Sequence, residues 1–217
     1  MTLEPRAQAP RPSEYPRTVT RQLTDRARRM TDAALDRVFD EPFEIRSADD
    51  FERVMGEHHV AMSFATAGAL AGFVERALPV AKLSTKAGKK IPMPAIKYTL
   101  AAIPIAMQLG NSVRHGIREI QVIASYLIHR LREAGVEPRR ELVSALALSI
   151  YLEPERRPDV GLTPGRAGPG LARTWIMRSI RKESTTVLAR RARADVEAVD
   201  RLDLRSVSKE WDSRPVS

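Results

Sequence analysis

Two short apolar segments without charged residues constrain the fold more than any other feature of this 217-residue chain. They cover residues 60–74 and 98–109, and neither reaches the roughly 20 consecutive apolar residues that a membrane-spanning helix requires. The connector between them carries four lysines: Lys82, Lys86, Lys89 and Lys90. The pattern predicts either a buried helical hairpin over residues 60–109 or a wedge that enters one leaflet of a membrane with its lysines at the lipid phosphates.

Composition and periodicity predict an all-α protein with little or no sheet. Apolar residues make up 43% of the chain and aromatic residues only 5%, which favours helices over a β-sandwich or barrel. Apolar residues recur every three or four positions over 18–39, 111–134 and 139–152. We expect these helices to pack as a bundle around a central apolar hairpin.

Proline and glycine divide the chain into four predicted parts. Four prolines within the first sixteen residues predict a disordered arm over residues 1–17. One helical domain is expected over 18–153, followed by a linker over 154–170 that holds four prolines and four glycines. Residues 171–217 are predicted to form a long basic helix, to about Leu204, and a frayed tail.

Local signals predict where several helices begin and end. Ser47 is expected to cap a short acidic helix, and Gly110 to separate the second apolar segment from the amphipathic helix after it. Gly135 is expected to end that amphipathic helix, and Pro138 to lie in the first turn of the next one.

Two glycines in the first apolar segment, Gly68 and Gly72, have the GxxxG spacing. With the alanines around them they form a ridge of small residues that lets a second helix backbone approach closely. We therefore predict that they are helix-packing residues.

The net charge is +9, but the charges are segregated along the chain. Residues 30–58 hold nine acidic and three basic side chains, so this acidic block can fold back on the basic segments and neutralise part of their charge. Cysteine is absent, which excludes disulfides, thiolate metal sites and cysteine nucleophiles and fits a reducing cytoplasm.

No catalytic motif is present in the sequence, so we expect a protein that is not an enzyme and uses no cofactor. The four histidines do not match a metal motif. His58 and His59 are adjacent, which is too compressed for the HExxH spacing, and His115 and His129 lie roughly 21 Å apart along a helix. No metal site is expected.

The preferred functional hypothesis is peripheral attachment, without catalysis, to an anionic membrane surface or a membrane protein complex at the cytoplasmic face of the membrane. Each basic side chain near an anionic surface contributes about 1 kcal/mol. The predicted lipid- or anion-binding residues are the connector lysines and four residues of the basic helix: Lys82, Lys86, Lys89, Lys90, Arg173, Arg178, Arg181 and Lys182.

Other functions stay open at this point. The arginine-rich termini can bind nucleic-acid phosphates, although acidic residues such as Asp195 and Asp200 interrupt the basic stripe. The chain can also be a soluble protein–protein adaptor, and self-association is a further alternative. In the plainest interpretation the basic helix is a solvated arginine face that packs against the acidic block over residues 30–58.

Residues 57–152 resemble the EcsC family. The resemblance depends on the Ala/Gly-rich stretch Ala65–Gly72, on the run IPMPAIKYTLAAIPIA over residues 91–106 and on REIQVIASYLIHRL over 118–131. Members of that family are mostly helical bacterial proteins in which apolar segments rich in small residues precede amphipathic helices. The resemblance implies a helical fold with a membrane or transport association, and it supplies no catalytic residues.

Overall fold

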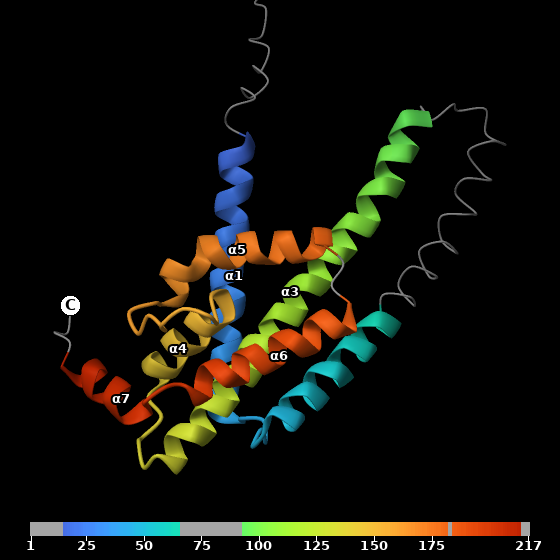
Figure 1. Cartoon of the computed structure of the whole chain (residues 1–217). Helices are drawn as coiled ribbons and strands as arrows, with labels where there is room; N and C mark the ends of the chain where they lie inside the picture. Colours follow the sequence, from blue (N-terminus) through green and yellow to red (C-terminus); the bar gives the residue numbers. More distant parts are fainter. Residues whose placement is uncertain (1–14, 66–92, 182–183, 214–217) are drawn as a thin grey trace, which may run out of the picture.

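The structure is a computed structural model that describes residues 15–65, 93–181 and 184–213. Every regular element within these ranges is an α-helix, which confirms the predicted all-α class (Figure 1). Residues 48–65 form a helix that carries no label in the figure. The labelled helices are α1 (Tyr15–Asp40), α3 (Met93–Glu133), α4 (Arg140–Leu152), α5 (Pro164–Arg181), α6 (Thr185–Asp200) and α7 (Leu204–Asp212).

The core lies between the second half of α3 and α4. Apolar side chains of α3 are buried from Ile120 to Leu131, and α4 is buried from Leu142 to Tyr151. A helix that is apolar on all sides belongs inside a protein. Because α3 also contacts α1, α5 and α6, it is the central element of the bundle.

The described part of the first apolar segment lies on the surface and not at the centre. Val60 and Phe64 are exposed, whereas Phe51 and Met55, earlier in the same helix, are buried. The 48–65 helix therefore packs on the core with its first half and presents apolar side chains to solvent with its second half. The rest of the first apolar segment lies outside the described residues.

Two of the predicted helix ends are confirmed by their hydrogen bonds. The Asp50 N–H donates to the Ser47 hydroxyl at 3.2 Å, so Ser47 caps the 48–65 helix. At the end of α3, Gly135 adopts a φ of 70°, a region that glycine enters without strain. The Val136 N–H then donates to the Leu131 carbonyl at 2.9 Å, which is the closing bond of a Schellman motif.

Two other predicted boundaries are wrong. Gly110 does not interrupt the chain, since α3 runs without a break from Met93 to Glu133. A glycine inside a helix costs only about 1 kcal/mol, which the packing of a 41-residue helix outweighs. Pro138 lies before α4 and not in its first turn, because Arg139 occupies the N-cap position.

The predicted linker over 154–170 and the single basic helix after it are also wrong. α5 begins at Pro164, inside the predicted linker, because the fixed φ of proline suits the first turn and no helical N–H is lost there. α5 ends at Arg181, and α6 begins at Thr185 with Ser184 as its cap. Residues 171–204, predicted as one helix, thus contribute to α5 and α6, and Leu204 begins α7.

Both ends of the chain differ from the prediction as well. α1 begins at Tyr15, inside the predicted arm, and residues 1–14 lie outside the described ones. Residues 204–212 form α7 where a frayed tail was expected. The Asp203 carboxylate stabilises this helix by accepting a hydrogen bond from the Ser206 N–H at 3.2 Å.

Gly116 of α3 lies in close contact with side chains of two other helices. A Cβ atom at this position would overlap Tyr151 Oη of α4 and Trp175 Nε1 of α5. We predict that Gly116→Ala lowers the free energy of unfolding by about 2 kcal/mol, because overpacking exceeds the gain in helix propensity. Urea unfolding measures the change.

Gly110→Ala is the matched control for this prediction. It lies in the same helix, and a Cβ atom there meets nothing within 4 Å. We expect it to raise the free energy of unfolding by about 0.5 to 1 kcal/mol through helix propensity alone. Equal changes in the free energy of unfolding for Gly116→Ala and Gly110→Ala would contradict the close packing at Gly116.

Candidate functional site

Several of the predicted site residues lie outside the described part of the chain. These are Lys82, Lys86, Lys89, Lys90, Lys182, Gly68 and Gly72. Arg181 is the last residue of α5, and its side chain also lies outside the description. The structure therefore places only Arg173 and Arg178 among the predicted lipid- or anion-binding side chains.

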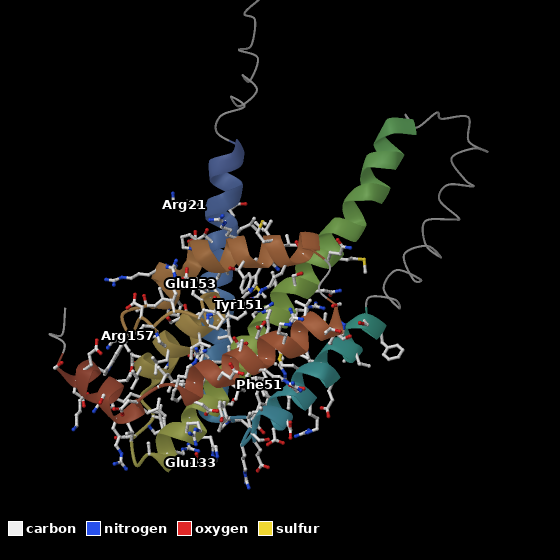
Figure 2. The ribbon with its side chains drawn as sticks, in the orientation of Figure 1. Arg21, Phe51, Glu133, Tyr151, Glu153 and Arg157 are labelled. Atoms are coloured by element: carbon white, nitrogen blue, oxygen red, sulfur yellow. The ribbon has the colours of Figure 1, made fainter. Side chains whose placement is uncertain are left out.

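Arg173 and Arg178 belong to α5 but have different surroundings. Arg173 is exposed and lines an open cavity of about 500 Å³ together with Thr174 and Met177. Arg178 is turned inward: its side chain is only 15% exposed, and its guanidinium lies over the Tyr151 ring at 4.2 Å. Tyr151 itself lies in the middle of the described helices (Figure 2). Arg178 is thus mostly buried and packs on Tyr151, and it also lines the open cavity. Its predicted anion-binding role stays a prediction.

A buried carboxylate, Glu119 of α3, receives arginines from two other helices. Its side chain is 4% exposed. Arg178 of α5 donates to Glu119 Oε2 at 3.1 Å, and Arg191 of α6 donates to Glu119 Oε1. Charge-assisted bonds of this kind are about twice as strong as neutral ones. Glu119 therefore ties α5 and α6 to the central helix.

A second acidic residue, Asp195 of α6, lies beside Glu119. It is 2% exposed. Burial raises the pKa of Asp195 well above its usual range, and the charge of Glu119 and a hydrogen bond with that carboxyl raise it further, while Arg191 and Arg178 oppose the shift. The protonated form of Asp195 is therefore favoured, while the guanidinium groups of Arg178 and Arg191 lie against the Glu119 carboxylate.

Paired carboxyls of this kind can act as an acid and a base in enzymes, but their position here indicates a structural role. The open cavity beside α5 is lined by Arg178 and Arg191, and neither Glu119 nor Asp195 is among its lining residues. The carboxyls hold the two guanidinium groups from behind. They fix the arginines in place and do not reach the cavity.

A cluster of three histidines joins the 48–65 helix to α3. The ring of His58 stacks on that of His115 with centroids 5.4 Å apart, and His59 approaches His115 edge-on at 5.8 Å. Sequence reasoning missed this cluster, because nothing in the spacing shows that two helices far apart in the chain meet at these positions. Within the described ranges, no group of three or more histidine, cysteine or acidic side chains is arranged to hold a metal ion.

Burial favours the neutral form of two of these histidines, His58 and His115. It lowers the pKa of His115 to about 4, against the opposing charge of Glu119 and with smaller contributions from His58, His59 and Arg191. Burial also lowers the pKa of His58, as does the charge of Arg118. Protonation of the cluster would place several positive charges within a few ångströms of one another.

Val60 and Phe64, in the last described turns of the 48–65 helix, form an exposed apolar end. Val60 is 53% exposed and Phe64 is 73% exposed, and their spacing of four residues places them on one face. In Figure 1 the N-terminal part of α3 extends away from the other labelled helices. Among the described helices, none has both the length and the apolar character needed to span a membrane.

The comparisons with known proteins return nothing for this chain. No family model matches it, no curated protein matches it, and no solved structure matches it. The resemblance to the EcsC family therefore stays a prediction. We therefore infer a function from the geometry of the chain's own residues.

The unequal protonation of the two buried carboxyls predicts unequal effects of their amide variants. Glu119→Gln leaves two guanidinium groups facing a neutral side chain, and we expect a loss of about 3 to 5 kcal/mol in the free energy of unfolding. Asp195→Asn replaces a protonated carboxyl by a group of the same shape, and we expect a loss below about 1.5 kcal/mol. Urea is the suitable denaturant because it adds no salt. A larger loss of stability for Asp195→Asn than for Glu119→Gln would assign the negative charge to Asp195.

The lowered pKa of His115 predicts a loss of stability in acid. Unfolded histidine titrates near pH 6.5 and folded His115 near 4, so between these values the unfolded chain binds more protons. The free energy of unfolding therefore falls as the pH drops through this window, by an amount on the order of 3 kcal/mol. His115→Gln is expected to flatten this dependence in urea unfolding series across the window.

His129→Asn is the control for the acid response. It removes a histidine from the same helix, at a position where the side chain is partly exposed and pairs with Glu133 at 3.2 Å. We expect this variant to keep the part of the pH dependence that His115 causes. If His115→Gln and the parent protein lose stability equally in acid, His115 is not the group that titrates.

Proposed function

We propose that the protein attaches peripherally, without catalysis, to an anionic membrane surface or to a membrane protein complex at the cytoplasmic face. The attachment uses the face of the 48–65 helix that carries Val60 and Phe64. The exposure of Phe64 is the observation that carries the proposal, because a large apolar side chain on one face of a helix end is suited to the interface of a membrane.

Apolar and electrostatic contributions act together in this proposal. Transfer of a phenylalanine side chain out of water contributes about 1.5 to 3 kcal/mol. The sequence that joins the 48–65 helix to α3 carries Lys82, Lys86, Lys89 and Lys90, each worth about 1 kcal/mol near anionic lipid. A single apolar anchor binds membranes only weakly, so two signals together are needed for stable attachment.

The alternative of nucleic-acid binding has less support, because several arginines already have carboxylate partners. Arg193 pairs with Glu52, Arg140 pairs with Asp36, and Glu119 receives two more arginines. Two of these pairs join the acidic block over residues 30–58 to basic helices, as the charge pattern predicted. The arginine content of the C-terminal region is thus used in part for packing.

Flotation of the full-length protein with vesicles tests the proposal. We expect flotation with phosphatidylglycerol-containing vesicles and none with pure phosphatidylcholine vesicles at physiological salt. The double variant Val60→Ser, Phe64→Ser should lower the affinity by about tenfold or more, since it removes more than about 1.4 kcal/mol of apolar transfer. The matched control is Met177→Ser, Val187→Ser, which changes two other exposed apolar residues and should float like the parent protein.

The lysines are tested separately by a fourfold glutamine variant at Lys82, Lys86, Lys89 and Lys90. We expect weaker flotation at low salt and a smaller effect of added salt, because screened charges no longer contribute. Unchanged flotation in both the serine and the glutamine variants would overturn the proposal. Salt-sensitive retention of DNA without flotation would favour the nucleic-acid alternative. The absence of both flotation and DNA retention would favour the adaptor.

A further inference from the structure

A cavity of about 410 Å³ lies where α1, α3 and α5 meet. Its volume is within the range of about 300 to 1,000 Å³ that is typical of small-molecule sites. The walls are mainly apolar and include Leu23, Met30, Leu109, Val113, Trp175 and Ile176. A cavity with such walls suits an apolar ligand group that leaves water on binding.

Gly110 and Trp175 give this cavity its shape. Gly110 lines it, and a Cβ atom at this position meets nothing within 4 Å, so the absence of a side chain leaves space against the helix. Trp175 is 3% exposed and packs against Gly116, which fixes the wall that it forms. The cavity is bounded by the buried Ala172 and Trp175 of α5 on one side and by α3 on the other, where Gly110 lies between the side chains of Leu109 and Val113.

Two arginines, Arg26 of α1 and Arg114 of α3, line the same cavity, and both are exposed. Among the ion pairs between described residues, neither takes part in one, in contrast to Arg140, Arg178 and Arg191. Two guanidinium groups at the solvent side of an apolar cavity create a positive potential that attracts an anionic group. Guanidinium groups also match carboxylate and phosphate oxygens in geometry.

We propose that this cavity binds an anionic amphiphile with one apolar chain. The chain lies along the apolar walls beside Gly110 and Trp175, and the anionic head, a carboxylate or a phosphate, contacts Arg26 and Arg114. This binding site is separate from the exposed apolar end at Val60 and Phe64, so it does not depend on the proposed membrane attachment.

Fluorescence of Trp175 in the full-length protein tests the proposal. The chain has two tryptophans, so Trp211→Phe leaves Trp175 as the sole reporter. Dodecanoate is titrated below the concentration at which it forms micelles, and we expect a saturable change in emission. Dodecanol, which has the same chain without the charge, should bind more weakly. A parallel titration with dodecyl phosphate distinguishes a carboxylate from a phosphate preference.

A variant that fills the cavity gives the decisive test of dodecanoate binding. Gly110→Leu adds a side chain into open space, and we expect dodecanoate affinity to fall at least about tenfold while urea unfolding shows an intact fold. Gly56→Leu is the matched control, because Gly56 also lies in a helix, a Cβ atom there meets nothing within 4 Å, and the residue does not line the cavity. This control should bind dodecanoate like the parent protein.

The arginines are tested by glutamine variants. Arg26→Gln and Arg114→Gln should each weaken dodecanoate binding by about two- to fivefold, as expected for exposed ion pairs, and leave dodecanol binding unchanged. Arg29→Gln, an exposed residue of α1 that does not line the cavity, should have no effect.

Three outcomes would overturn the proposal: no saturable change at Trp175, equal affinity of the Gly110→Leu variant and the parent protein, or equal affinity for dodecanol and dodecanoate. The test is distinct from that of membrane attachment. Gly110→Leu should still float with vesicles, and the Val60→Ser, Phe64→Ser variant should still bind dodecanoate.

Discussion

The arrangement of the C-terminal helices depends on one buried carboxylate. Glu119 of α3 accepts hydrogen bonds from Arg178 of α5 and Arg191 of α6, and the protonated Asp195 supplies a neutral neighbour to the same carboxylate. A buried charge costs several kcal/mol unless it is paired, so this cluster stabilises the fold only when all of its members are present. The helices α5 and α6 are thereby held at fixed positions on α3. Arg178 and Arg191 are used for packing. The net charge of +9 is therefore larger than the positive charge that remains for a binding partner.

Contacts around Gly116 connect this cluster with the cavity between α1, α3 and α5. Trp175 forms one wall of the cavity and packs beside Tyr151 over Gly116. The ring of Tyr151 in turn lies under the guanidinium of Arg178, which is one of the two partners of Glu119. A chain of direct contacts thus leads from the cavity wall to the charge cluster. Through these contacts the charge cluster supports the position of Trp175 in the cavity wall.

Features with a local cause could be predicted from the sequence, and features that depend on distant residues could not. Ser47 and Gly135 act on backbone groups within a few positions, so their roles were correctly predicted. Gly110 was misjudged as a break because its neighbours predict an interruption, while packing along a long α3 keeps the helix intact. The clusters around Glu119 and His115 combine residues from helices that are far apart in sequence, and no spacing reveals such meetings. The pairing of Arg178 with Glu119 could not be predicted either, because the two residues lie on different helices.

Each proposed binding region combines basic side chains with apolar ones. At the cavity, Arg26 and Arg114 take part in no ion pair between described residues, whereas Arg140, Arg178, Arg191 and Arg193 pair with acidic side chains. The connector lysines follow the exposed Phe64 in the sequence and precede α3. Basic side chains beside apolar ones suit anionic amphiphiles and anionic membranes alike, because both present anionic groups next to apolar chains. Leu109, Gly110, Val113 and Arg114, which line the cavity, belong to α3, whose N-terminal part extends away from the other labelled helices (Figure 1). A protein that approaches a lipid surface with that end would bring the cavity close to the same surface, where single-chain anionic amphiphiles partition.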